Sequence, residues 1–294
     1  MSGRGSGLER WPALVLTAGL ATRLQPLSSV RAKAALPVAG EPLISRILRW
    51  LHGHGIRRVV LNLHHRAASI TSIVGDGSRW GLSVRYSWET EVLGSAGGPA
   101  RAIPLLEADR FLIVNGDTLT DIDLPALTAQ HLDTNALVTM AVADADPRYN
   151  AIVANEAGIV TAFAKRAPTE NPTFGTLGSP ARFHFIGVQA VNAAVFSGVR
   201  PDQKSETVHG IYPALLARPG AMRIFRTTRE FHDIGSPQDY LRTALRFASR
   251  ESRPIDRGSS SIVGAGASST ICETSVTPVL SSDCAREGPL QRAS

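Results

Sequence analysis

The stretch from Gly19 to Lys33 carries residue types that bind phosphate. A glycine follows an apolar run directly, and Arg23 and Lys33 come after it. A glycine behind a buried strand lets backbone N–H groups turn toward an anion, and the two cations add charge. The stretch has neither the Gly-Lys-Ser/Thr ending of a P-loop nor the later glycines of a dinucleotide fingerprint. It is therefore either a phosphate-binding loop of another kind or an ordinary solvated turn.

Lysine is rare in this chain, which otherwise uses arginine. Its three lysines are Lys33, Lys165 and Lys204. An ammonium is a compact point charge, whereas a guanidinium is a planar fork, so the two are not interchangeable. We expect each lysine to be there for a specific reason.

Two carboxylates stand where a divalent cation could bind. Asp117 ends the run Asn115-Gly-Asp117, which follows the apolar segment Phe111–Val114. Asp233 comes just before Gly235 and a helix whose cap is expected at Ser236. Mg²⁺ prefers one or two carboxylates together with substrate phosphates. Because Asn, Gly and Asp are also common in turns, each carboxylate taken alone is either a metal ligand or turn chemistry.

The elements that must position these residues alternate between strands and helices. Strands are predicted at Ala13–Thr17, Arg58–Leu63, Ser83–Ser87 and Phe111–Val114, and helices at Leu43–Leu51, Ala67–Val74 and Ala96–Ile103. This alternation indicates an α/β, Rossmann-like sheet, mainly parallel and flanked by helices. Ligands bind beyond the carboxyl ends of such strands, so the loops after Thr17 and Val114 should share one edge.

The second half of the chain has fewer helices. Strands are predicted at Leu137–Val142, Ala151–Ala154, Ile159–Ala164 and Arg182–Val191, and helices at Val208–Leu216 and Ser236–Phe247. This pattern favours a mixed or antiparallel extension of the sheet. We expect one domain over residues 1–250, followed by a Ser-, Gly- and Ala-rich tail over residues 251–294.

Composition narrows the class of protein. The chain has 294 residues, 43% of them hydrophobic, and a net charge of +6 that is scattered rather than gathered on one run. A nucleic-acid partner is therefore not expected. No stretch reaches the roughly 18 uninterrupted apolar residues of a membrane span. The first ten residues lack the apolar segment of a signal peptide, so we expect a cytoplasmic protein.

The segment from Leu14 to Pro42 resembles the signature of the sugar-phosphate nucleotidyltransferases, also called nucleoside-diphosphate-sugar pyrophosphorylases. That signature is a strand, then AGxGTRLxPLT, then a lysine followed by LPV-G-PL. The chain has Thr17-Ala-Gly-Leu-Ala-Thr-Arg-Leu-Gln-Pro-Leu-Ser28 and Lys33-Ala-Ala-Leu-Pro-Val-Ala-Gly-Glu-Pro-Leu43. Later segments match in order, at Leu93–Gly98, Val114–Asp117, Phe185–Gly187 and Asp233–Tyr240. The resemblance covers Ala13 to about Phe247.

The resemblance implies roles for particular residues. Arg23 and Lys33 would be catalytic, binding the phosphates and the leaving pyrophosphate. Asp117 and Asp233 would hold Mg²⁺. The nucleoside triphosphate would be bound by Ala18, Gly19, Leu20, Ala21, Thr22, Arg23, Gly94, Ser95 and Gly116. The sugar 1-phosphate would be bound by Gly187 and by Lys165 or Arg166.

Among the departures from the family pattern, two bear on whether the chain is active. Ala21 stands where the family has its second glycine, and Lys165-Arg166 replaces the Glu-Lys of an F-x-E-K-P segment. These departures motivate a second hypothesis, a non-catalytic, regulatory sugar-nucleotide-binding homologue. Retention of both Asp117 and Asp233 argues for the enzyme, because a sensor need not keep two metal carboxylates.

The resemblance also gives expectations for the substrates and for the C-terminal tail. The short insertions and the segment Gly75–Arg79 resemble bacterial mannose-1-phosphate guanylyltransferases, and a uridylyl- or thymidylyltransferase for N-acetylmuramate or glucose phosphate is the alternative. In the tail, Ser261–Ser268 and Ile271–Thr277 resemble turns of the left-handed β-helix of some members. A stable β-helix needs about three or more repeats, so we expect a short remnant. A homodimer contact through it is left open.

Overall fold

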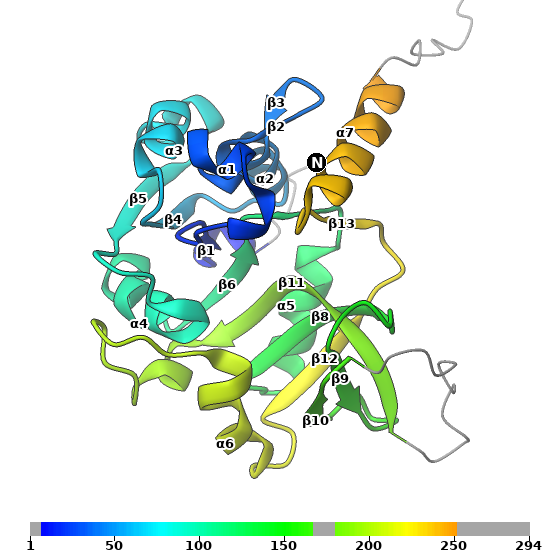
Figure 1. The fold of residues 1–294 in the computed structure, drawn as a ribbon. Helices are drawn as coiled ribbons and strands as arrows, with labels where there is room; N and C mark the ends of the chain where they lie inside the picture. The colour runs from blue at the N-terminus through cyan, green and yellow to red at the C-terminus, as the bar shows by residue number, and fades with distance from the viewer. Residues whose placement is uncertain (1–6, 167–179, 252–294) are drawn as a thin grey trace, which may run out of the picture. The chain divides into compact units, whose positions relative to one another are not determined.

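The computed structural model describes residues 7–166 and 180–251, which contain a mixed sheet of nine strands (Figure 1). The strand order is β10-β9-β11-β6-β1-β4-β5, with β8 paired to both β11 and β12. Its strands are β1 (Ala13–Leu16), β4 (Arg58–Leu63), β5 (Ser83–Trp88), β6 (Arg110–Asn115), β8 (Val138–Asp144), β9 (Ala151–Ala154), β10 (Val160–Ala164), β11 (Ala181–Asn192) and β12 (Met222–Arg226). Strands β6, β1, β4 and β5 are parallel, and β11 is antiparallel to β6, β8 and β9. The predicted mixed α/β sheet is confirmed.

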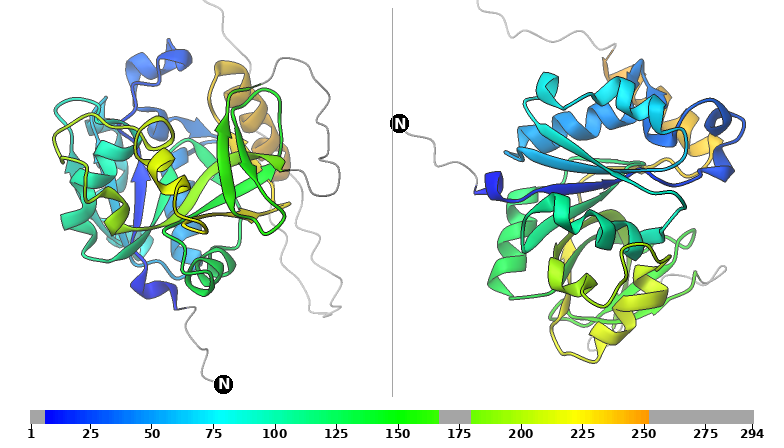
Figure 2. Two further views of the ribbon diagram at one scale, coloured as in Figure 1. Left: turned by 90° about the horizontal axis from the view of Figure 1, so that it is seen from below. Right: turned by 90° about the vertical axis from the view of Figure 1, so that its left-hand side faces the viewer.

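Successive residues of each strand face two separate hydrophobic cores. In β1, Ala13 and Val15 belong to one core and Leu14 to the other, as the two-residue period of a strand requires. The first core is covered by α2 (Leu43–Gly53), α3 (Ala67–Val74) and α5 (Leu124–Asp133), and the second by α4 (Gly94–Leu106) and α6 (Tyr212–Leu216). Figure 2 shows α2 and α3 on one side of β1 and α4 on the other. Near-continuous apolar strands are the consequence of burial on both faces.

The parallel half of the sheet brings several strand ends to one edge. Leu16, at the end of β1, is level with Asn62 of β4 and with Asn115 of β6. The chain leaves β6 close to β1, because the Gly116 N–H donates to the Leu16 carbonyl at 2.9 Å. The predicted shared edge of the loops after Thr17 and Val114 is therefore confirmed.

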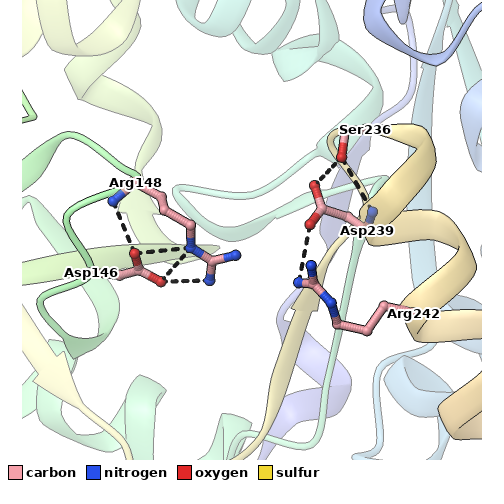
Figure 3. A network of polar contacts seen from close by, with 5 residues as sticks. All are labelled: Asp146, Arg148, Ser236, Asp239 and Arg242. Atoms are coloured by element: carbon pink, nitrogen blue, oxygen red, sulfur yellow. Dashed lines mark hydrogen bonds and ion pairs between the residues drawn. The ribbon is translucent and has the colours of Figure 1, made fainter.

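A two-stranded ribbon stands at this edge, made of β7 (Thr118–Thr120) and β13 (Phe231–Asp233). Helix α7 (Pro237–Glu251) follows β13 and lies beside the ribbon (Figure 1). The predicted cap is confirmed: Ser236 Oγ donates to Asp239 Oδ2 at 2.6 Å and accepts from the Asp239 N–H at 3.2 Å (Figure 3). Such a reciprocal cap fixes where a helix begins.

The remaining short elements complete the chain's path. They are α1 (Leu27–Val30), β2 (Pro37–Val38), β3 (Glu41–Pro42), a π-helical turn (Thr207–Ile211) and 3-10 turns at Leu8–Arg10, Thr22–Leu24, Lys33–Ala35, Ser78–Trp80 and Ala193–Phe196. The single helix predicted over 208–216 is instead the π turn followed by α6. The reason is that the Ile211 N–H bonds the Glu206 carbonyl, five residues back, at 3.1 Å.

The expected tail falls outside the described residues, whereas the expectation on membrane spans concerns helices inside them. The β-helix-like segments 261–268 and 271–277 lie outside them, as does all of the predicted tail after residue 251. Among the helices of residues 7–166 and 180–251, none has the length and apolar character needed to cross a membrane.

Candidate active site

The loop after β1 is anchored by one apolar side chain and leaves its polar residues at the surface. Ala18 is buried, whereas Gly19 and Leu20 are exposed. Leu24 is fully buried in the first core and ends the 3-10 turn Thr22–Leu24. Because Leu24 points inward, the neighbouring Arg23 is held at the exposed side of that turn. The loop thus presents the backbone and the guanidinium predicted to face phosphate.

Lys33 and Asp117 form the closest contact of the site. The Lys33 Nζ lies 2.5 Å from Asp117 Oδ2. Lys33 begins a 3-10 turn whose Ala34 and Ala35 are buried, and the preceding Ala32 N–H donates to Ser69 Oγ at 2.9 Å. The Lys33 side chain therefore approaches Asp117 from a fixed backbone. The rarity of lysine predicts a specific role for this residue, and its contact with Asp117 provides one.

Asp233 is brought beside Asp117 by the ribbon. Its partner across the strands is Thr118, the residue after Asp117, and the Ile234 N–H donates to the Asp117 carbonyl at 3.1 Å. Burial, and then the charge of Asp117, raise the pKa of Asp233 to about 6, against the opposing effect of Lys33. A carboxylate whose ionisation is opposed by a neighbouring carboxylate is a ready site for a cation.

Arg23 joins this cluster because its guanidinium and the Asp233 carboxylate both lie near Gly235. A Cβ at Gly235 would lie 3.4 Å from Asp233 Oδ2 and 3.7 Å from Arg23 Nη2. Both side chains therefore flank Gly235. Arg23, Lys33, Asp117 and Asp233, far apart in the sequence, converge at one edge of the sheet; we name these four residues the charged centre.

The charged centre suits a cation that substrate completes. No group of three or more His, Cys, Asp or Glu side chains with metal-binding geometry occurs among the residues that the structure describes. A preformed all-protein cage is thus absent from them. Mg²⁺ is commonly held by one or two carboxylates, with phosphate oxygens and water completing its shell. The Asp117–Asp233 pair fits Mg²⁺ on that basis.

Two predicted glycines pack the ribbon against the sheet. A Cβ at Gly116 would lie 2.6 Å from the Leu16 carbonyl oxygen, closer than any real contact. Gly187 has φ +82°, and a Cβ there would meet Thr118 Oγ1 at 2.6 Å. Glycine is required at both places, at the second also because L-residues rarely adopt a positive φ. Gly116 and Gly187 therefore let the segment that carries Asp117 sit close to β1 and β11.

Gly94 and Ser95 begin α4, and their contacts are with a segment that the sequence did not single out. Ser95 Oγ donates to Glu206 Oε2 at 2.6 Å and accepts from the Thr207 N–H at 2.8 Å. The Ser205 carbonyl accepts from the Ala96 N–H at 2.9 Å. Ser95 and Glu206 are 111 positions apart in the sequence, so no local signal indicated this pairing.

A buried polar chain joins the first loop to Gly94. Asn62 Oδ1 accepts from the Thr17 N–H at 2.7 Å, and Asn62 Nδ2 donates to Glu89 Oε1, also at 2.7 Å. Glu89 Oε2 then accepts from the Leu93 N–H at 2.9 Å. Such fully bonded buried networks fix geometry, because an unmade bond would be costly. The sequence could have indicated Asn62, since it stands at the carboxyl end of a predicted parallel strand.

Four side chains, those of Asp146, Arg148, Tyr149 and His184, form a group that we name the second wall. Figure 3 shows its Asp146–Arg148 pair across from the start of α7. Asp146 and Arg148 form a forked ion pair, with Arg148 Nη2 2.6 Å from Asp146 Oδ2, and this bond raises the pKa of Arg148. The rings of Tyr149 and His184 are tilted against each other with centroids 4.0 Å apart, and the His184 ring lies 5.2 Å from that of Phe231 on the ribbon. Burial lowers the pKa of His184 to about 4, so the imidazole is neutral at neutral pH. Sequence analysis missed this wall.

The two predicted sugar-phosphate cations lie just beyond β10. Lys165 and Arg166 are both exposed, and the Arg166 N–H donates to Asn150 Oδ1 at 3.1 Å. This bond ties them to the loop that carries Tyr149 rather than to the charged centre. They are thus at the second wall.

Comparison with known proteins gives a consistent picture. A family model described as Nucleotidyl transferase matches residues 12–250. The mannose-1-phosphate guanylyltransferase of Mycobacterium tuberculosis is 31% identical over 234 residues, which are 78% of this chain and 62% of that protein. The N-acetylmuramate alpha-1-phosphate uridylyltransferase of Neisseria meningitidis is 44% identical over 115 residues, 39% of this chain and 50% of that protein. The chain therefore spans about half to two thirds of the length of these two relatives.

A solved structure shares the fold. HddC from Yersinia pseudotuberculosis, complexed with GMP-PN, superposes with a TM-score of 0.67 at 22% identity. The match covers 81% of this chain and 99% of that one. It bears on the fold alone.

Ala21 has a left-handed backbone, with φ 50°, which costs an L-residue about 1–2 kcal/mol. We expect Ala21→Gly to raise the free energy of unfolding by about 0.5–1 kcal/mol, because relief of strain outweighs the added freedom of the unfolded chain. Ala68→Gly, the same change on the exposed face of α3, should lower it by about 1 kcal/mol. Urea unfolding of both variants checks the pair; a destabilised Ala21→Gly protein would contradict the left-handed assignment.

Asp233 should make the stability of the metal-free protein depend on pH. The pKa of Asp233 is about 6 in the folded chain against 3.8 for an unperturbed aspartate, so the folded state binds the proton more tightly. Stability from this group is then present at low pH and is lost as pH rises through its folded pKa. We expect Asp233→Asn to melt above the parent protein at neutral pH in EDTA, with the difference closing as pH falls below that pKa. A difference independent of pH would refute the shift.

Proposed function

The chain belongs to the nucleotidyl transferase family, and from this premise we propose that it is a sugar-1-phosphate nucleotidyltransferase. An oxygen of the sugar 1-phosphate attacks the α-phosphorus of a nucleoside triphosphate, and pyrophosphate leaves. The observation that carries the proposal is the charged centre, where Arg23 and Lys33 meet Asp117 and Asp233 at the carboxyl edge of β1 and β6. Two cations and two carboxylates there match a triphosphate bound with a divalent cation.

The residues act chiefly by position and charge, as is usual for transfer at phosphorus. Arg23 and Lys33 neutralise the charge that grows on the leaving pyrophosphate. Asp117 and Asp233 would hold Mg²⁺, which would supply Lewis-acid polarisation of the reacting phosphate. Lys33, 2.5 Å from Asp117, also fixes the position of that carboxylate. The exposed backbone of Gly19 to Thr22 receives the phosphates.

Strand alternation favours Arg166 over Lys165 as the sugar-phosphate ligand. Ala164 pairs with Ala151, which pairs in turn with His184, so these side chains share one face of the sheet. His184 is on the face of the ribbon, 5.2 Å from Phe231. Continued two residues past Ala164, the period of two places Arg166 on that face and Lys165 on the opposite one.

Guanosine triphosphate and mannose 1-phosphate are the substrates we favour. The Mycobacterium tuberculosis relative is named a mannose-1-phosphate guanylyltransferase, and its similarity extends over 78% of this chain. A uridylyltransferase for N-acetylmuramate phosphate is the runner-up, because the Neisseria meningitidis relative is 44% identical over a shorter stretch. A thymidylyl- or uridylyltransferase for glucose 1-phosphate is a further alternative. A non-catalytic sugar-nucleotide-binding homologue is the remaining reading; the four residues of the charged centre argue against it.

Asp117→Asn should abolish pyrophosphate release without unfolding the protein. The change removes one of two cation ligands and leaves Lys33 without its carboxylate. Release is measured with Mg²⁺ over a matrix of GTP, UTP and dTTP against mannose, glucose and N-acetylmuramate 1-phosphates. Asp109→Asn is the control, because that exposed carboxylate precedes the amino end of β6, at the opposite edge of the sheet. Release undiminished in Asp117→Asn would refute the assignment, and none from the parent protein with any pair would favour the non-catalytic homologue.

Arg166→Ala should raise the KM for the sugar phosphate by about tenfold or more, as expected for a lost charged hydrogen bond of about 1.5–3 kcal/mol. The KM for the nucleotide should not change. Lys165→Ala is the matched control, since both side chains are exposed cations one residue apart. Steady-state kinetics of the two variants provide the test, and an equal or larger effect from Lys165→Ala would overturn the alternation argument.

A further inference from the structure

Glu89 is a buried carboxylate that stands outside the charged centre. It follows β5 directly and is 6% exposed. Its carboxylate accepts from the side-chain amide of Asn62 and from the backbone N–H of Leu93, which are both neutral donors. Burial of a carboxylate is costly unless hydrogen bonds replace its lost hydration. The reason for an acid at this position should therefore lie in the pattern of these bonds.

The hydrogen bonds around Glu89 all run toward its two oxygens. A backbone N–H can only donate, so the Thr17 N–H must face Asn62 Oδ1, which it meets at 2.7 Å. Asn62 therefore turns its donor, Nδ2, toward Glu89 Oε1, also at 2.7 Å. From the other side, the Leu93 N–H donates to Glu89 Oε2 at 2.9 Å. Glu89 is thus the common acceptor of two donors, one on each oxygen.

A carboxylate meets this requirement and an amide does not. Both oxygens of a carboxylate accept, whereas a glutamine side chain has one accepting oxygen and one donating nitrogen. In Glu89→Gln the new nitrogen would face either Asn62 Nδ2 or the Leu93 N–H, and that bond would be lost. The pattern of donors therefore specifies glutamate over glutamine at position 89.

The two ends of this chain of bonds are the two segments predicted to hold the nucleotide. Thr17 immediately precedes the exposed loop after β1, and its hydroxyl also donates to the Asn62 carbonyl. Leu93 immediately precedes the first residue of α4. Asn62 and Glu89 thus join the start of the loop to the start of the helix through buried side chains.

Helix α4 packs directly on these side chains because it has a glycine there. A Cβ at Gly98 would lie 2.8 Å from Glu89 Oε1 and 2.9 Å from Asn62 Nδ2, closer than real contacts. Leu93 is also held by a second segment, since the Ser205 N–H donates to its carbonyl at 2.9 Å. The start of α4 therefore has little freedom to compensate for a change at Glu89.

We propose that Glu89 is a positioning residue of the nucleotide site, which sets the spacing between the loop after β1 and the start of α4 by accepting from both. It acts through Thr17 and Leu93 rather than by contact with the reacting atoms. Loss of one of its bonds lets the two segments move relative to each other, so the nucleotide is bound less tightly. The inference rests on the proposed function, because it concerns how the nucleoside triphosphate is held.

The test exchanges the two side-chain types in the double variant Asn62→Asp/Glu89→Gln. The acid at position 62 accepts from the Thr17 N–H and from the new amide at position 89. The oxygen of that amide still accepts from the Leu93 N–H. All three bonds and the net charge are those of the parent protein, and only the place of the carboxylate has changed.

Dissociation constants for GTP, UTP and dTTP are measured on the full chain with Mg²⁺ by equilibrium dialysis. We expect Glu89→Gln and Asn62→Asp each to weaken binding of the preferred triphosphate by about tenfold, as a buried polar group left without its partner should. The double variant should return to within about twofold of the parent. The KM for the sugar phosphate should be the same in all of them.

Thr139→Val is the matched control for a general loss of stability. Thr139 is fully buried, and its hydroxyl lies 2.9 Å from His131 Nδ1. It stands near the amino end of β8, which runs parallel to β6, so it is at the opposite edge of the sheet from Thr17. We expect this variant to unfold at lower urea concentration than the parent and to bind the triphosphate as the parent does.

Three results would overturn the positioning role. The first is parental triphosphate binding by Glu89→Gln. The second is a double variant as weak as the weaker single variant, which would mean that the carboxylate is needed at position 89 itself. The third is an equal loss of binding in Thr139→Val.

Failure of the proposed function would look different, because the variants are compared by binding rather than by turnover. A parent protein that binds a triphosphate but releases no pyrophosphate would contradict the proposed reaction alone. A parent protein that binds none of the three triphosphates would contradict both proposals.

Discussion

The structure depends on holding two carboxylates close together against their mutual repulsion. Burial, and then the charge of Asp117, disfavour the ionisation of Asp233, whose pKa rises to about 6. Lys33, at 2.5 Å from Asp117, and after it Arg23, offset part of that cost. An arrangement with this much unfavourable energy persists only where the surrounding fold over-determines it. The backbone around the charged centre is correspondingly constrained.

That constraint comes from close backbone approaches that only certain residues allow. Gly116 lets the chain leave β6 within 2.9 Å of the Leu16 carbonyl, and Gly187 makes room beneath Thr118. The ribbon then fixes Asp233 relative to Asp117 through strand pairing rather than through flexible side chains. Sites supported by paired strands hold their geometry more tightly than sites on free loops.

Much of this arrangement could be predicted from the sequence, for physical reasons that also explain the gaps. Buried parallel strands such as Arg58–Leu63 are continuous apolar runs, and the residues of the charged centre lie in motifs or at strand ends, so both were predicted. The ribbon was not, because three-residue strands carry no periodicity; α5, with Pro125 in its first turn, was also missed. Glu206 and the wall of Asp146 and His184 had no local signal, since their partners are brought to them only by tertiary folding.

The two departures from the family pattern, at Ala21 and at Lys165-Arg166, have different consequences in the folded chain. A glycine is expected where φ is positive, and Ala21 does have φ 50°, so the loop keeps its conformation despite the added methyl group. The left-handed conformation of Ala21 lowers the stability of the fold by about 1–2 kcal/mol. The exposed loop backbone and Arg23 stay in place. Lys165 and Arg166 differ in another way, because they change charge at the second wall, where Asp146 is already tied to Arg148. Ala21 is therefore weak grounds for a non-catalytic homologue, whereas the second wall is where a difference in the accepted sugar phosphate would arise.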